Sequence, residues 1–130
     1  MEAMELMARR EALGLDQAGL AAVMRWDKLA LADCEAGTRE TPAMVDAKLD
    51  ELELARDTIA GILEDALPGD LPTYSSDGAF WARWPRFRGV PASVHRVATA
   101  DALRSAKWAG IQARIVPASP TVAGQGTSTA

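Results

Sequence analysis

The fold is decided by residues 13–37, which read LGLDQAGLAAVMRWDKLALADCEAG. Two short apolar segments lie here on either side of Arg25 and Trp26. Asp16 and Asp27 stand just before these segments, where a carboxylate accepts hydrogen bonds from the first free N–H groups of a helix. The stretch therefore predicts two short helices joined by a tight turn, over residues 17–24 and 28–36.

Further helices are expected on both sides of this pair. Residues 5–13 place Leu6, Arg10 and Leu13 on one helical face, and Gly14 ends that helix. A long helix begins at Pro42 and continues to about residue 66, a length of roughly 36 Å. The apolar residues that we expect on its inner face are Val45, Leu49, Leu52, Ile59, Ile62 and Leu63.

The sequence Leu-Pro-Gly-Asp at positions 67–70 interrupts this periodicity and marks a boundary. Beyond it we expect short strands over 71–74 and 112–116, a helical turn over 79–84 and a helix over 91–109. Residues 117–130 carry no charge and little apolar surface, so we expect them to be disordered. The chain is therefore predicted to be mainly α, with a four- to five-helix domain and long linking helix (1–66), a small α+β domain (67–116) and a tail (117–130).

The amino-acid composition excludes several classes of function. One cysteine and one histidine in 130 residues exclude an internal disulfide and a closed zinc site. We expect no cofactor and no metal, and no motif places a catalytic nucleophile, acid or base, so no enzyme is predicted. Cys34 is expected in the core and His95 on the surface. Without a signal peptide or an apolar stretch long enough for a bilayer, we expect a cytoplasmic protein with no membrane partner.

Residues 13–24 resemble the phage repressor and Cro family, whose pattern is close to L-G-L-S/N-Q-x-x-L-A-x-x-h. The match continues without gaps through 26–31 and 34–37. The resemblance implies a helix-turn-helix that binds double-stranded DNA, and a homodimeric repressor acting on a palindromic operator. It also implies an ion pair between Arg10 and Glu35. The chain departs from the family pattern at Arg25, where a glycine is usual.

The resemblance assigns the DNA contacts. Lys28 would face guanine, Asp33 would accept from a cytosine amine, and Leu29 and Ala32 would touch a thymine methyl. Contacts to the DNA backbone would come from Gln17, Arg25, Thr38 and Arg39. Residues 1–53, however, carry six basic and twelve acidic side chains. That acidity favours an alternative, a protein-interaction or antitoxin-like module whose helix-turn-helix scaffold no longer reads DNA.

Residues 80–114 hold seven basic side chains and one acidic one, with aromatics interleaved at the start. We favour a dimer core with arginines at its rim, and binding of RNA by the Trp and Arg residues is the alternative. The expected dimer residues are Phe80, Trp81, Trp84, Phe87, Val94, Val97 and Trp108. Residues 74–80 also resemble, more weakly, the Y-P-D-G-x-F turn of anti-CRISPR-associated repressors, with Ser75 and Ser76 in place of the proline. That likeness implies an autorepressor of a small phage or bacterial operon.

Overall fold

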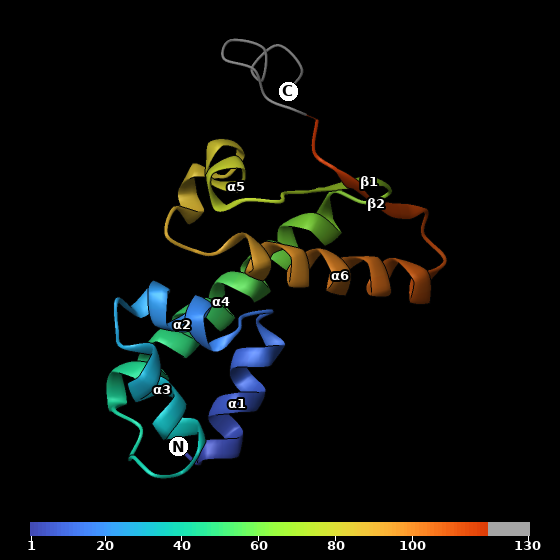
Figure 1. Ribbon diagram of the computed structural model, residues 1–130. Coiled ribbons are helices and arrows are strands. Elements are labelled where there is room, and N and C mark those ends of the chain that lie inside the picture. Colours follow the sequence, from blue (N-terminus) through green and yellow to red (C-terminus); the bar gives the residue numbers. More distant parts are fainter. Residues whose placement is uncertain (120–130) are drawn as a thin grey trace.

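The computed structural model describes residues 1–119, and this part of the chain is mainly helical with a small parallel sheet (Figure 1). The expectation of a mainly α fold is confirmed. None of the helices in the described residues is both long and apolar enough to cross a membrane. The elements are α1 (Ala3–Ala12), α2 (Gln17–Met24), α3 (Lys28–Glu35), α4 (Ala43–Asp65), β1 (Gly69–Thr73), α5 (Asp77–Arg83), the 3-10 helix η1 (Pro85–Phe87), α6 (Ala92–Ala109) and β2 (Ala113–Pro117).

Helices α2 and α3 begin where the sequence predicts. The Asp16 carboxylate accepts a hydrogen bond of 2.6 Å from the backbone N–H of Gly19, and the Asp27 carboxylate accepts one of 3.0 Å from Leu29. Both bonds satisfy N–H groups that a helix start leaves free. The local sequence therefore fixes where each of the two helices starts.

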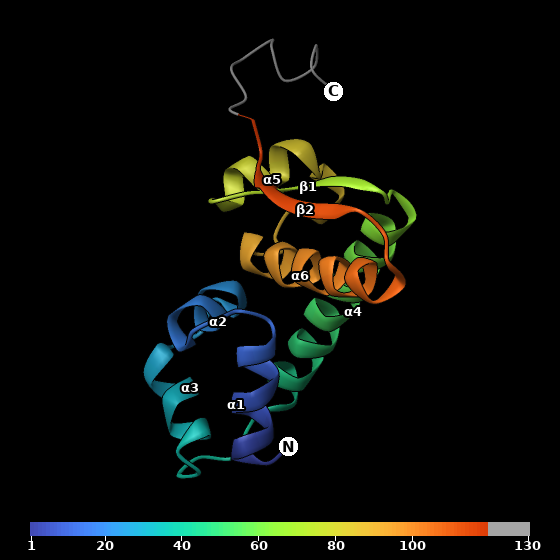
Figure 2. The same cartoon turned by 90° about the vertical axis from the view of Figure 1, so that its right-hand side faces the viewer.

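Two apolar cores lie on either side of the middle of α4. The first is enclosed by α1, α2, α3 and the first half of α4, and it also receives Val94 from α6. The second contains Ile59 and Leu63 from the other half of α4, together with residues from β1, α5, η1 and α6. Helix α4 is thus shared by both cores, and Figure 2 shows α6 crossing it with the strands and α5 beyond. Ile62 was expected inside but is 38% exposed, because the neighbouring positions Ile59 and Leu63 take the buried face.

Strands β1 and β2 pair in parallel, from Gly69 opposite Ala113 to Thr73 opposite Pro117. The backbone N–H of Ala118 then donates to the carbonyl of Thr73 at 2.8 Å. The expected disorder from residue 117 onward is therefore wrong for residues 117 and 118, which pair with β1. The rest of that expectation, residues 120–130, lies outside the described residues.

The turn after α1 packs directly against α6. Gly14 has a φ of +73°, and a Cβ at this position would lie 3.1 Å from Cγ2 of Val97 and 3.4 Å from Ser93. A side chain here would therefore meet both backbone strain and close contact. Val97, which is expected in a dimer interface, is half-buried at this contact within one chain, and its place in a dimer stays a prediction.

Candidate nucleic-acid interface

A buried hydrogen-bond network connects α1, α2 and α3. Arg10 donates to both carboxylate oxygens of Glu35, at 2.6 and 2.8 Å, and its third nitrogen donates to the carbonyl of Leu15 at 2.8 Å. Gln17 donates to the same carboxylate at 3.1 Å. The predicted ion pair is thus confirmed as a bidentate contact, and it fixes the end of α3 against the start of α2.

The protonation states of this network follow from its geometry. The hydrogen bonds to Glu35 raise the pKa of Arg10 above its ordinary value, against the opposing effect of burial. Burial raises the pKa of Glu35, but the hydrogen bonds from Arg10 and Gln17 outweigh it and leave that pKa below its ordinary value. Both groups are therefore charged at neutral pH, and the network holds its form across the physiological range.

Gln17 is less free than the resemblance implies. One hydrogen of its amide nitrogen is directed at Glu35, so one further N–H remains for a phosphate. Gln17 and Lys28 line the same shallow hollow, of about 300 Å³, where α2 and α3 both begin. The Asp16 carboxylate lines this hollow too, so Lys28 and the helix N-termini draw an anion there against one negative charge.

The outer face of α3 carries residues with no structural partner in the described part of the chain. Its inner face buries Ala30, Leu31, Cys34 and Glu35. Lys28 and Asp33 are exposed and make no ion pair within residues 1–119, Ala32 is half-buried, and Leu29 is 72% exposed. An exposed leucine between a lysine and an aspartate has no role in the fold, and it is suited to contact with another molecule.

The turn between α2 and α3 is strained at Arg25. Its φ of +52° and ψ of +45° are left-handed, and among residues 1–119 it is the only non-glycine residue with positive φ. This geometry explains why glycine suits the position, since a side chain here costs roughly 1–2 kcal/mol. The Arg25 side chain is exposed.

Beyond α3, Arg39 and Thr38 differ in their freedom. The Arg39 guanidinium lies 5.2 Å from the centre of the Trp26 ring, which holds it beside the turn. The Thr38 hydroxyl donates to the carbonyl of Asp33 at 3.2 Å. Arg39 is therefore held in place and makes no hydrogen bond or ion pair within residues 1–119, whereas the Thr38 hydroxyl is already engaged as a donor.

Sequence reasoning missed the role of Arg9. This side chain donates to Asp46, Asp50 and Glu53 of α4 at 2.7–2.9 Å and thereby joins α1 to α4. The signal was available, because positions 46, 50 and 53 fall on one helical face. These acids belong to the contact between α1 and α4.

Seven residues of the second half were expected at a dimer interface, and this is wrong for the three that the single chain already buries, Phe80, Phe87 and Val94. Phe80 and Val94 are fully buried within the single chain and Phe87 is 7% exposed, so they have no surface for a partner. Trp81 and Trp84 are half-buried, and their indole N–H groups donate to Val90 and Tyr74. Only Trp108 of the expected set is well exposed, at 87%.

The expected surface position of His95 is also wrong. Its side chain is fully buried and lies 4.9–5.2 Å, ring centre to ring centre, from Tyr74, Phe80 and Trp84. Burial, with a smaller effect of Arg96, lowers the pKa of His95 to about 4. The imidazole is thus a neutral core residue.

Within residues 1–119 no group of three or more His, Cys, Asp or Glu side chains could hold a metal ion. Neither a protein-family model nor a curated protein matches the chain. Its function must therefore be inferred from its own geometry.

Proposed function

We propose that the protein is a DNA-binding transcriptional regulator in which α2 and α3 form a helix-turn-helix. The observation that carries the proposal is the outer face of α3, where Lys28, Leu29 and Asp33 are exposed next to the N-terminus of α2. In this geometry α3 enters the major groove and the N-terminus of α2 meets a backbone phosphate.

The buried network supports this reading. Arg10, Glu35 and Gln17 fix the angle between the two helices with three charge-assisted hydrogen bonds. A rigid angle matters for a DNA reader, because a small rotation of α3 would move every side chain away from its base. Arg25 in the turn before α3, and Arg39, whose guanidinium lies over Trp26 of the same turn, would contact phosphates and set the register.

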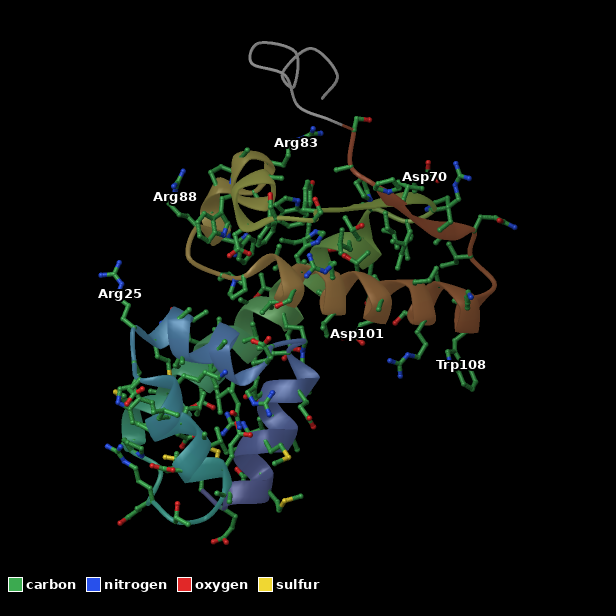
Figure 3. The ribbon with its side chains drawn as sticks, viewed as in Figure 1. Arg25, Asp70, Arg83, Arg88, Asp101 and Trp108 are labelled. Atoms are coloured by element: carbon green, nitrogen blue, oxygen red, sulfur yellow. The ribbon has the colours of Figure 1, made fainter. Side chains whose placement is uncertain are left out.

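We further propose that the regulator is a homodimer acting as a repressor of a small operon on a palindromic site. One α3 offers few side chains for base contacts, so two copies are needed for useful specificity. In the second half, apolar side chains exposed for association lie from the end of α6 to β2, where Trp108, Ile111 and Ile115 are 87%, 41% and 40% exposed. Leu54 on α4, at 68%, is a further exposed apolar side chain. Figure 3 shows Trp108 projecting from the far end of α6.

The alternative is a protein-interaction module built on the same scaffold. The exposed Leu29 and the nearby acids Asp27, Asp33 and Glu40 favour it, because an acidic surface with an apolar centre also suits a basic protein partner. The two readings differ in what Asp33 does. In a DNA reader, Asp33 accepts a hydrogen bond from a cytosine amine or repels incorrect base sequences. In a protein-interaction module, Asp33 has no influence on which DNA sequence is bound.

Selection of duplexes from a random pool tests the proposal. The wild-type protein should enrich a defined sequence, and Asp33→Asn should change the enriched sequence. Lys28→Gln should relax one base pair per half-site at a cost of roughly 1–3 kcal/mol, whereas Lys107→Gln, the same charge change at the end of α6, should leave the preference intact. Featureless and identical preferences for all four proteins would overturn the proposal.

A further inference from the structure

Three arginines around η1 stand without an acidic partner. Arg83, Arg86 and Arg88 are exposed, and no carboxylate of residues 1–119 lies within 4.0 Å of them. The arginines closer to the end of the described chain differ, since Arg104 and Arg114 each lie beside an aspartate. The segment around η1 thus presents positive charge that the rest of the described chain does not neutralise.

Two of these arginines are supported by aromatic rings. The Arg86 guanidinium lies 5.1 Å from the centre of the Phe87 ring, and that of Arg88 lies 5.9 Å from the Trp81 ring. Phe87 is buried and the indole N–H of Trp81 donates to Val90 at 2.7 Å, so both supports are fixed in the fold. A guanidinium placed over a ring keeps its N–H groups for another acceptor, and its ordering on binding costs little entropy.

One of these arginines, Arg88, lies across a cleft from the turn between α2 and α3. This cleft, of about 600 Å³, is lined by Arg25 from that turn and by Trp81 and Gly89 from the second half. Two acids, Asp16 and Asp77, also line it, and both accept backbone N–H groups at helix starts. Arg88 precedes Gly89 and lies over the Trp81 ring, so it stands on the opposite side of the cleft from Arg25. In Figure 3 Arg25 and Arg88 project from the same edge of the molecule.

We infer that Arg86 and Arg88 form a second phosphate-binding surface, which contacts the DNA backbone beside the base pairs that α3 reads. The inference rests on the proposed function and extends it to the second half of the chain. A guanidinium binds a phosphate with two parallel hydrogen bonds, and each such contact adds affinity without adding sequence preference. The chain would then bind DNA with two separate elements, one that reads bases and one that binds only the backbone.

Two observations favour duplex DNA over other partners. Stacking on single-stranded nucleic acid needs free aromatic faces, whereas Phe80 and Phe87 are buried and Trp81 lies beneath Arg88. A protein interface is centred on exposed apolar side chains, and among the described residues no large apolar side chain between Leu63 and Lys107 is well exposed. Unpaired arginines without apolar surface fit phosphates best.

The test uses the full chain, a random-sequence duplex of about three helical turns and a single-stranded RNA of the same length. The double variant Arg86→Gln/Arg88→Gln is compared with Arg104→Gln/Lys107→Gln, which removes the same charge from the exposed side of α6. Affinity is measured by fluorescence anisotropy over a range of salt concentrations. Thermal unfolding by circular dichroism checks that both variants fold.

The slope of log affinity against log salt should fall by about two for the first variant, close to one unit per lost phosphate, and should stay unchanged for the second. Adding Arg25→Gln to the first variant should lower the slope by about one further unit. Equal slopes for the two double variants, with Arg25→Gln still effective, would overturn the inference and leave the proposed function standing. If Arg86→Gln/Arg88→Gln loses RNA binding but keeps duplex binding, the two arginines bind a single strand, and the inference is overturned as well. Absence of duplex binding by the wild-type protein would overturn both.

Discussion

His95 makes the stability of this protein depend on pH, and the size of the effect can be worked out from its surroundings. The imidazole is fully buried among Tyr74, Phe80 and Trp84, and within residues 1–119 its Nε2 atom has no hydrogen-bond partner. Its Nδ1 atom lies 3.3 Å from the Thr99 hydroxyl, which is already bonded to the carbonyl of residue 95. No group here stabilises a positive charge, so acid must favour the unfolded chain.

The pKa of His95 is lowered from 6.5 to about 4 in the folded protein. The unfolded chain therefore takes up a proton between pH 6.5 and 4 while the folded chain does not, so stability is lost as pH falls through this window. Because each pKa unit is worth about 1.4 kcal/mol, the full difference is about 3 kcal/mol. Between pH 7 and pH 4.5, about 2 kcal/mol of it should be lost.

Urea unfolding at pH 7 and pH 4.5 measures this loss, and His95→Leu separates it from the titration of carboxylates. Leucine has a similar volume and cannot take up a proton, so the variant should lose about 2 kcal/mol less than the wild-type protein over the same interval. The chain has a single histidine, so its imidazole signal in proton NMR reports the folded pKa directly. An equal loss in both proteins, or a titration near pH 6.5 in the folded state, would refute the reasoning.

Three further outcomes follow from particular contacts. Arg10→Met leaves the Glu35 carboxylate buried without its partner and should cost about 3–5 kcal/mol of unfolding free energy, of which adding Glu35→Leu recovers a part; additive losses in urea unfolding would show that the two side chains do not interact. Arg25→Gly relieves the left-handed strain but gives the unfolded chain more freedom, so the free energy of unfolding should rise by about 0.5–1 kcal/mol. Affinity for duplex DNA should fall, because the guanidinium is lost. A variant that is less stable than the wild-type protein and binds the duplex equally tightly would contradict this. Trp108→Ser should convert dimers to monomers in light scattering without lowering the melting temperature, and an unchanged mass would place the dimer contact elsewhere.

Local signals in the sequence predicted the helices well because each boundary depends on neighbouring residues. Asp16, Asp27 and Gly110 stop or start their helices through bonds to the backbone within a few positions. The Arg10–Glu35 pair was also predictable, but only through the family pattern, since its partners are 25 residues apart.

The sequence did not reveal that α4 contributes side chains to the cores of both halves. The aromatic segment looked too apolar for one small domain, and this suggested a dimer. The second half of α4 supplies Ile59 and Leu63 to cover it, so the chain buries Phe80 and Phe87 by itself. His95 was misplaced for the same reason, because its aromatic neighbours come from elements up to 21 positions away.

The acidic first half is the main objection to a DNA contact, and the structure shows where those charges lie. Of the twelve acids in residues 1–53, four surround Arg9, one pairs with Arg10, one with Lys48, and Asp16 and Asp27 cap helices. The four acids around Arg9 leave an excess of three negative charges where α1 meets α4, and this is half of the net negative charge of residues 1–53. The exposed face of α3 carries one acid, Asp33, and one base, Lys28. The net charge of that face is therefore zero. In the proposed complex, attraction to phosphates would then come from Arg25 and Arg39 beside the turn before α3 and from Arg86 and Arg88 around η1. A strong salt dependence that vanishes with these four arginines, and not with Lys28, is what this distribution of charge requires.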